Sequence, residues 1–194
     1  MGLSLRSVER LLSACFEADP PVSTGTTKAL LVTTEQLVKQ QNGSLSFTRP
    51  ALTIFPYRLE VNRATRAAWA GASAVDGRAH LPLDLHFLIT PWATDAEHEL
   101  RILGKAIECL DTTPILAGPL LKTADAAWAP NEGVQVMMDE VATDTVMRTF
   151  DVLPTDYKLS VPYIARVVRV DGKRAFADPT ATEVKVGMRP LGAK

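Results

Sequence analysis

Asp84 and His86 are the two residues whose types and spacing come closest to a catalytic arrangement. Residues two apart on a strand share one face of a sheet, so a carboxylate could lie beside an imidazole, as in the acid–base pair of a hydrolase. A nucleophile is missing from the pattern, because no serine or cysteine signature such as G-x-S-x-G accompanies the pair. We therefore interpret Asp84 and His86 as polar cross-strand contacts of a sheet, and keep a small hydrolase that uses both as an alternative.

The histidine and cysteine positions do not predict a metal site. His80, His86 and His98 lack the spacing of zinc ligands, and no H-E-x-x-H, G-x-G-x-x-G or G-x-x-x-x-G-K-[ST] motif is present. Cys15 falls on the apolar side of an expected helix, where a free thiol behaves as a small hydrophobe. Cys109 falls off the main apolar stripe of another expected helix. We expect no metal, no cofactor and two free thiols.

A cluster of arginines with one tryptophan lies in the first half of the chain. Guanidinium groups pair with phosphates and an indole stacks on bases, so this cluster could form a nucleic-acid groove. A pI near 6.3 gives such binding little electrostatic support. We favour a solvated or protein-contacting loop, with a nucleic-acid-binding module as a weaker alternative. The residues concerned are Arg58, Arg63, Arg66, Arg78 and Trp69.

The composition predicts a soluble globular domain. With 194 residues, of which 46% are hydrophobic and 22% charged, the chain is long enough to bury a sizeable core. No apolar run approaches the roughly 20 residues that a membrane span needs. The N-terminal segment carries Glu9, Arg10 and Glu17 within its apolar pattern, which favours an amphipathic helix over a secretory signal and hence cytoplasmic synthesis. We expect one domain over residues 1–170 and a C-terminal extension over residues 171–194.

The stretch from Leu81 to Leu116 is the most regular part of the chain, and it predicts a strand followed by a helix. From Leu81 to Ile89, apolar residues occupy every second position and mostly polar residues lie between them. In a strand this alternation places the two kinds on opposite faces, so one face should be apolar and the other mostly polar. The strand should end at a break formed by Pro91 and Trp92.

The helix should begin at Thr94, which stands three residues before Glu97 in the capping-box relation. Pro114 should end the helical region. A strand and a helix with one apolar face each form half of a two-layer domain. The apolar residues of the helix recur at spacings of three and four and make one stripe that should be buried: Ala96, Leu100, Leu103, Ile107 and Leu110.

Further helices and strands are predicted on either side of this stretch. Helices are expected over residues 4–18 and near residues 143–152, the second capped by Thr143 or Asp144. Strands are expected over residues 51–61, 134–138 and 157–170.

Two of these expected strands contain a proline. Pro56 and Pro162 each remove a donor from the hydrogen-bond ladder, so both strands should lie at an edge of the sheet or carry a bulge. Residues 62–80 lack a convincing period and should form a long loop or flap. We therefore predict an α/β fold of two layers, with a mixed and partly antiparallel sheet packed by helices and a C-terminal extension.

Charge is distributed unevenly along the chain, although the net charge is only −1. The formal charge is +3 over residues 1–80, −9 over residues 81–157 and +5 over residues 158–194. Oppositely charged surfaces can neutralise each other within one monomer. They can also meet head to tail between copies, as a closed ring requires. The sequence leaves both interpretations open.

Four segments carry a resemblance to a known family. They are LTIFPYRLEVNRATR, LPLDLHFLITPWATDAEHELRILGKAIECLDTTPIL, VQVMMDEVATDTVMRTFDVL and YKLSVPYIARVVRVD. In this order they resemble successive blocks of the tail cap, or tail-terminator, proteins of extracellular contractile injection systems. Those systems are phage-tail-like particles such as antifeeding prophage and Photorhabdus virulence cassettes. The similarity covers most of residues 1–170 and is weakest in residues 62–80 and after residue 171.

The resemblance implies a structural, non-enzymatic role, and no catalytic residue carries over with it. Subunits of that family are similar to phage tail terminators, α/β proteins that form a hexameric ring, close the inner tube and anchor the last sheath layer. A tail-completion or connector subunit of a contractile phage is the alternative.

The expected partners follow from the same resemblance. We expect a homo-oligomer that contacts inner tube and sheath proteins, is cytoplasmic during assembly and then belongs to the particle. We expect neither a nucleic-acid partner nor a membrane span. The candidate protein-contact residues are charged ones: Arg58, Arg63, Arg66, Glu97, Glu99, Glu108, Arg166 and Arg169.

Overall fold

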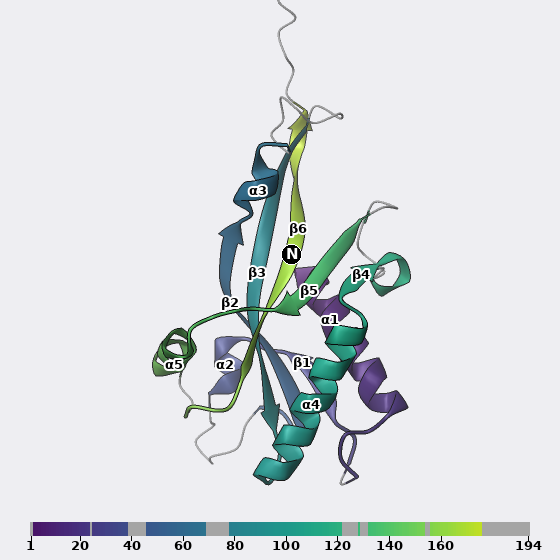
Figure 1. The fold of residues 1–194 in the computed structure, drawn as a ribbon, viewed down its shortest axis with the longest axis vertical. Coiled ribbons are helices and arrows are strands. Elements are labelled where there is room, and N and C mark those ends of the chain that lie inside the picture. Colours follow the sequence, from purple (N-terminus) through teal and green to yellow (C-terminus); the bar gives the residue numbers. More distant parts are fainter. Residues whose placement is uncertain are drawn as a thin grey trace, which may run out of the picture.

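A six-stranded sheet forms the centre of the computed structural model, which describes residues 2–23, 25–38, 46–68, 78–121, 128, 132–153 and 156–175 (Figure 1). The strand order is β1-β2-β3-β6-β5-β4. β1 pairs with β2 in parallel and the other neighbours pair antiparallel, which confirms the predicted α/β fold with a mixed sheet. The strands are β1 (Lys28–Leu31), β2 (Ala51–Val61), β3 (Arg78–Trp92), β4 (Ile115–Ala117), β5 (Gly133–Met138) and β6 (Val161–Ala175).

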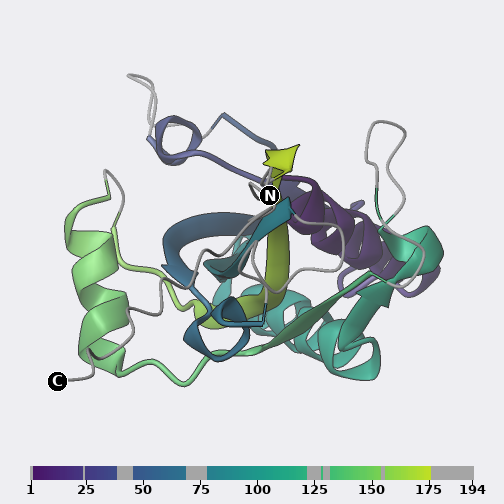
Figure 2. The ribbon, with the colours of Figure 1, turned by 90° about the horizontal axis from the view of Figure 1, so that it is seen from above.

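Helices cover the two faces of the sheet unequally (Figure 2). The long helices α1 (Gly2–Ala18) and α4 (Ala96–Thr112) pack together across one face, called here the inner face. Helix α5 (Thr143–Asp151) lies on the outer face, where Val146 and Phe150 pack against Leu88 of β3. The short elements are α2 (Thr34–Leu37), α3 (Arg63–Arg66) and the 3-10 turn η1 (Gly118–Leu120).

Strand β3 is buried on both faces, including the face that the sequence predicts to be mostly polar. Every residue from Pro82 to Trp92 is buried, including Asp84 and His86. The predicted break at Pro91 is wrong, since β3 continues through it to Trp92. Proline is tolerated there because β6 pairs with β3 only as far as Ile89, so no ladder donor is needed on that side. Alternation therefore located the strand but not what covers its polar face.

The buried stripe of α4 is rotated from the predicted one. Ile102, Ala106 and Cys109 are buried together with Leu103 and Leu110, whereas the side chain of Leu100 is 56% exposed. The helix contacts α1 as well as strands of the sheet, so two neighbours determine which of its sides is covered. The prediction that Leu100 belongs to the buried stripe and that Cys109 lies off it is therefore wrong.

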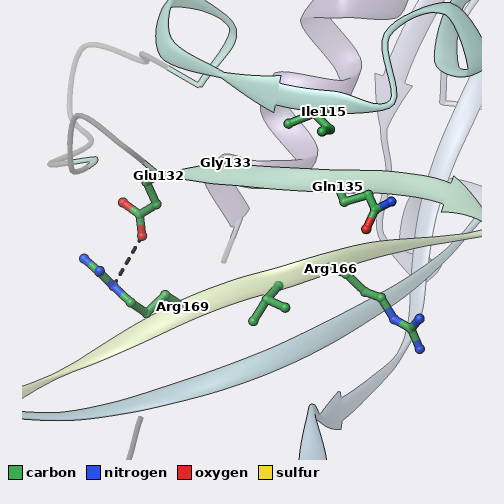
Figure 3. Close-up of a pocket in the computed structure, with 7 residues that line it drawn as sticks. Ile115, Glu132, Gly133, Gln135, Arg166 and Arg169 are labelled. Carbon is green, nitrogen blue, oxygen red and sulfur yellow. Dashed lines mark ion pairs between the residues drawn. The ribbon is translucent and has the colours of Figure 1, made fainter. Parts of the chain in front are cut away.

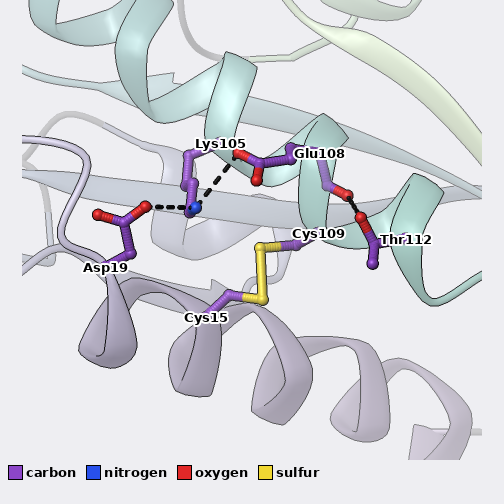
Figure 4. The surroundings of a disulfide bond; sticks show 6 residues. All are labelled: Cys15, Asp19, Lys105, Glu108, Cys109 and Thr112. Carbon is purple, nitrogen blue, oxygen red and sulfur yellow. Dashed lines mark hydrogen bonds and ion pairs between the residues drawn. A yellow bond between two sulfur atoms is a disulfide. The ribbon is translucent and has the colours of Figure 1, made fainter.

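Cys15 of α1 and Cys109 of α4 form a disulfide (Figure 4). The prediction of two free thiols is wrong, because the two helices lie side by side on the inner face although 94 residues separate the cysteines. Close to the disulfide, Lys105 Nζ lies 2.6 Å from Asp19 Oδ2 and 3.2 Å from Glu108 Oε2. A covalent bond and an ion pair therefore both connect the end of α1 to α4.

Pro56 lies in β2 at a position where the pairing with both neighbouring strands leaves room for a proline. In the described residues β1 pairs with β2 from Ala51 to Ile54, so Pro56 lies beyond the reach of β1. On the other side, the register between β2 and β3 shifts between Pro56 and Arg58. The predicted bulge is confirmed.

Pro162 has a different explanation, because β6 lies inside the sheet between β3 and β5. Pairing with β5 starts at Tyr163, so Pro162 is in the ladder with β3 alone. Its carbonyl accepts a hydrogen bond of 2.9 Å from Asp139 N. β6 is not an edge strand, but its register with β3 shifts between Leu83 and Leu85, so the bulge predicted for this strand is present, a few residues beyond Pro162. β6 continues past residue 170 to Ala175, and residues 176–194 of the expected extension lie outside the described residues.

The helix caps differ from the predicted ones by one residue. Helix α5 has Ala142 as its N-cap instead of Thr143 or Asp144. Helix α4 begins after Asp95 instead of Thr94, and Asp95 Oδ1 accepts a 2.9 Å hydrogen bond from His98 N. Part of the expected loop 62–80 forms α3 and the start of β3, and residues 69–77 lie outside the described residues.

The cap of α4 predicts a dependence of stability on pH. Hydrogen bonds from the backbone and the ring of His98 lower the pKa of Asp95 from 3.8 to about 2. A carboxyl group whose pKa is lower in the folded protein stabilises the fold above its unfolded pKa, and that stabilisation is lost as pH falls towards the folded value. Between pH 4 and pH 2, the thermal midpoint should therefore fall more steeply for the natural protein than for Asp95→Asn. Circular dichroism melts would contradict this if the two curves ran parallel.

Candidate functional site

Asp84 is the centre of a polar cluster on the outer face of β3. Asn62 Nδ2 donates to both of its carboxylate oxygens, at 3.0 and 3.1 Å, and Arg166 Nε lies 3.3 Å from Oδ2. Asn62 also caps α3, because its Oδ1 accepts a 3.1 Å hydrogen bond from Thr65 N. A buried carboxylate needs partners to offset the loss of water, and these two provide them. Asp84 thereby connects β3 to the start of α3 and to β6.

His86 has partners of its own on the same face. Its Nδ1 lies 2.6 Å from Asp139 Oδ2 and its Nε2 lies 3.7 Å from Glu60 Oε2. The imidazole side chain is 5% exposed, and the ring of Tyr57 lies edge-on at 6.3 Å between centroids. Burial, and then the charge of Asp139, raise the pKa of the Tyr57 hydroxyl. His86 thereby connects β3 to the end of β5 and to β2.

This arrangement is that of a structural cluster. Within the described part of the chain, the hydrogen bonds and ion pairs of Asp84 and His86 are made with carboxylates, an amide and a guanidinium. A general base needs a nucleophile within hydrogen-bond reach, and these contacts supply none. The two side chains share a sheet face, as the sequence predicts, and each is held by separate partners.

Three of the predicted contact residues, Arg58, Arg63 and Arg66, lie in the first half of the chain, and all three are exposed. Arg58 NH2 lies 2.8 Å from Glu60 Oε2, and this hydrogen bond raises the pKa of Arg58 and lowers that of Glu60. Arg63 and Arg66 are exposed on α3, at the far end of the β2–β3 ribbon from α4 (Figure 1). Of the suggested nucleic-acid loop, Trp69 and the side chain of Arg78 lie outside the described residues.

Arg166 and Arg169 line a pocket of about 510 Å³ on the outer side of β4, β5 and β6 (Figure 3). Arg169 Nε lies 3.3 Å from Glu132 Oε1, and Arg169 NH2 donates to Asp171 Oδ2 at 3.1 Å. Arg166 pairs with Asp84, as described above. Both guanidinium groups are therefore held by carboxylates of the same subunit. Ile115, Gly133 and Gln135 complete the labelled lining.

The acidic candidates on α4 also divide into two kinds. Glu97 and Glu108 are exposed and pair with Arg101 and Lys105 of their own helix. Glu99 is mostly covered: it forms an ion pair with Lys158 and its Oε1 accepts a 3.3 Å hydrogen bond from Ala93 N. Glu99 therefore supports the join between β3 and α4 instead of contributing to an open surface.

Lys158, the partner of Glu99, also contacts Trp92 at the end of β3. Lys158 Nζ lies 4.8 Å from the centre of the Trp92 ring, a cation–π contact, and Trp92 Nε1 donates to Thr53 Oγ1 at 2.9 Å. The indole is 3% exposed and packs against Phe47. Lys158, in the segment before β6, is thereby attached to the end of β3 at Trp92.

Metal-binding clusters and membrane-spanning helices are both absent from the described residues. No cluster of three or more His, Cys, Asp or Glu side chains that could hold a metal occurs among them. Among the described helices, none combines the length and apolar character needed to cross a membrane.

Comparison with known proteins identifies a protein family and a fold shared with solved structures. The family model described as the Pvc16 N-terminal domain matches residues 6–183. A solved structure, the sheath/tube terminator in the extended state of the extracellular contractile injection system PVC, superposes with a TM-score of 0.56 at 16% identity. The match covers 96% of this chain and 63% of that chain, so the present chain spans less than two thirds of its solved relative. At this identity the likeness shows the fold. A search of curated proteins returns no match.

The polar cluster predicts a large effect of Asp84→Ala on stability. The substitution removes both acceptors of Asn62 and the partner of Arg166, so it should lower the free energy of unfolding by about 1.5 to 3 kcal/mol. Asp144→Ala, at an exposed carboxylate on α5, is the matched control and should cost about 0.5 kcal/mol or less. Urea unfolding measures both. If both substitutions lowered the free energy of unfolding equally, the cluster around Asp84 would not stabilise the fold more than an exposed carboxylate does.

Proposed function

This chain belongs to the Pvc16 N-terminal domain family, and on that premise we propose that it is a terminator subunit closing the sheath and tube of a contractile injection particle. The observation that carries the proposal is the family match over residues 6–183, supported by the shared fold of a sheath/tube terminator. The resemblance seen in the sequence is confirmed by the same match. The likeness to an injection-system terminator favours such a particle over a contractile phage, where a connector subunit would have a similar task.

The proposed role is mechanical and non-enzymatic. A terminator has to bind neighbouring subunits and resist displacement, which requires a rigid body with exposed contact surfaces. The inner core supplies the rigid body, and the cluster around Asp84 and His86 fixes the outer connections to it. The proposed partners are tube and sheath proteins, and the proposed place of assembly is the cytoplasm, before the particle becomes extracellular.

A hexameric ring is the proposed arrangement of the subunits. A ring is built from heterologous contacts, so each subunit needs two different faces that complement one another. Arg63 and Arg66 on α3 and Glu97 and Glu108 on α4 are exposed and opposite in charge, and α3 lies apart from α4 (Figure 1). The contacts are assigned to these four residues, with Arg58 next to the arginines, because all five are exposed, even though Glu97, Glu108 and Arg58 also pair within the subunit. Glu99 and Arg169 are mostly covered, and Arg166 is held by the buried Asp84.

Charge reversal tests the ring and the terminator role together. Arg63→Glu with Arg66→Glu should remove the ring from particles and give particles of variable length, because like charges would face each other. Adding Glu97→Arg and Glu108→Arg to the same chain should restore the complementarity and the uniform length. Length distributions from electron micrographs are the measurement.

The controls separate charge complementarity from net charge. Arg148→Glu, at an exposed arginine of α5, changes the charge by the same sign at a surface outside the proposed contact and should leave length unchanged. Deleting the protein should reproduce the variable lengths. Uniform particles in its absence would overturn the terminator role, whereas uniform particles with the first double variant would overturn the contact assignment alone.

A further inference from the structure

We infer that the Cys15–Cys109 disulfide is a lock that closes after the subunit has folded and left the reducing cytoplasm, fastening α1 to α4. The inference rests on the proposed function, since only a subunit made in the cytoplasm and later exposed outside it meets both redox environments. Disulfides persist in oxidising surroundings, and cytoplasmic reductants keep thiols reduced. A structural disulfide in such a subunit therefore has to form late.

The fold brings the two cysteines together without the covalent bond. Leu12 and Phe16 of α1, on either side of Cys15, are buried in the same core as Ala106 and Leu110 of α4, on either side of Cys109. The Cα atoms of the two cysteines are 6.5 Å apart, a separation that disulfides span. Apolar packing therefore aligns the helices, and the reduced thiols can pack as small hydrophobes.

An ion pair supports the same alignment. Lys105 Nζ lies one turn of α4 before Cys109 and 2.6 Å from Asp19, which follows the end of α1 (Figure 4). Hydrogen bonding to Asp19 and then to Glu108 raises the pKa of Lys105, so the cation persists through the physiological range. The last turn of α1 is thus held beside α4 in the reduced protein, with the two sulfur atoms facing each other.

The chemistry requires an external two-electron acceptor, for which a low-molecular-weight disulfide suffices. Cys15 is partly exposed whereas Cys109 is 5% exposed, so the Cys15 thiolate attacks the small disulfide first and releases one small thiol. The Cys109 thiolate then displaces the second small thiol from Cys15. The two cysteines lose two electrons and two protons, and both pass to the two small thiols.

The disulfide restricts the movement of α1 and stabilises the fold. It encloses the whole segment between α1 and α4 in one covalent loop, which removes conformations from the unfolded state. It also keeps α1 from separating from α4. The bond therefore adds stability to a fold that already exists. Its natural place is the released particle, where no further synthesis can replace a damaged subunit.

Thiol trapping in cells tests the timing. Cells that make the particle are lysed in a maleimide carrying a polyethylene glycol chain, and the subunit from the cytoplasm is compared with the subunit from released particles treated with oxidised glutathione. The cytoplasmic subunit should gain two labels and the released subunit none. A cytoplasmic subunit already closed, or a released one still carrying two thiols, would overturn the inference. Absence of the subunit from released particles would instead overturn the proposed function.

Measurements on the purified full chain test whether folding precedes disulfide formation, and they do not depend on the proposed function. The reduced natural protein should be folded, and oxidised glutathione should raise its thermal midpoint by about 5 to 10 °C. Cys15→Ala with Cys109→Ala should fold and show no response to oxidant. Cys109→Ala, which leaves Cys15, should react with oxidised glutathione several-fold faster than Cys15→Ala. An unfolded reduced protein, or equal rates for the single variants, would contradict the proposed sequence of events.

Discussion

Strand β3 is buried from Pro82 to Trp92, so each of its two faces has to be covered, and the rest of the chain is arranged to do so. On the inner face the requirement is met by apolar packing, in which Leu83, Phe87 and Ile89 meet α1 and α4. Burying one such side chain is worth about 1.5 to 3 kcal/mol, so this layer supplies most of the drive to fold. The two covering helices must therefore lie side by side, which brings Cys15 and Cys109 together.

On the outer face the requirement is met differently, because β3 carries Asp84 and His86 there. A buried charge without partners costs several kcal/mol, whereas a paired and hydrogen-bonded one is tolerated. The partners come from three separate segments of the chain: Asn62 lies between β2 and α3, Asp139 follows β5, and Arg166 lies within β6. The polar side chains of one strand thus specify where three other segments lie, which is a positioning role and not a chemical one.

Ion pairs within the subunit also hold several of the charged side chains that the sequence nominates as contacts. Carboxylates of the subunit hold Arg166 and Arg169, and Lys158 holds Glu99. Arg63 and Arg66 on α3 are exposed, and so are Glu97 and Glu108 on α4, which pair only with residues of their own helix among the described ion pairs. A scaffold that satisfies its inner charges and leaves unlike charges exposed on separate helices fits a subunit that assembles with copies of itself.

The amino-acid sequence determined the elements and the family. Alternation marked β2, β3 and β6, helical periodicity marked α1 and α4, and four segments pointed to tail terminators, because these signals depend on neighbours along the chain. The tertiary structure decided the rest. Whether the polar face of β3 is wet, which side of α4 is buried, and that Cys15 meets Cys109 all depend on segments distant in sequence. Asn62 had no signal of its own for the same reason. A pattern shows which face differs from the other, and only the packed neighbours determine what each face touches.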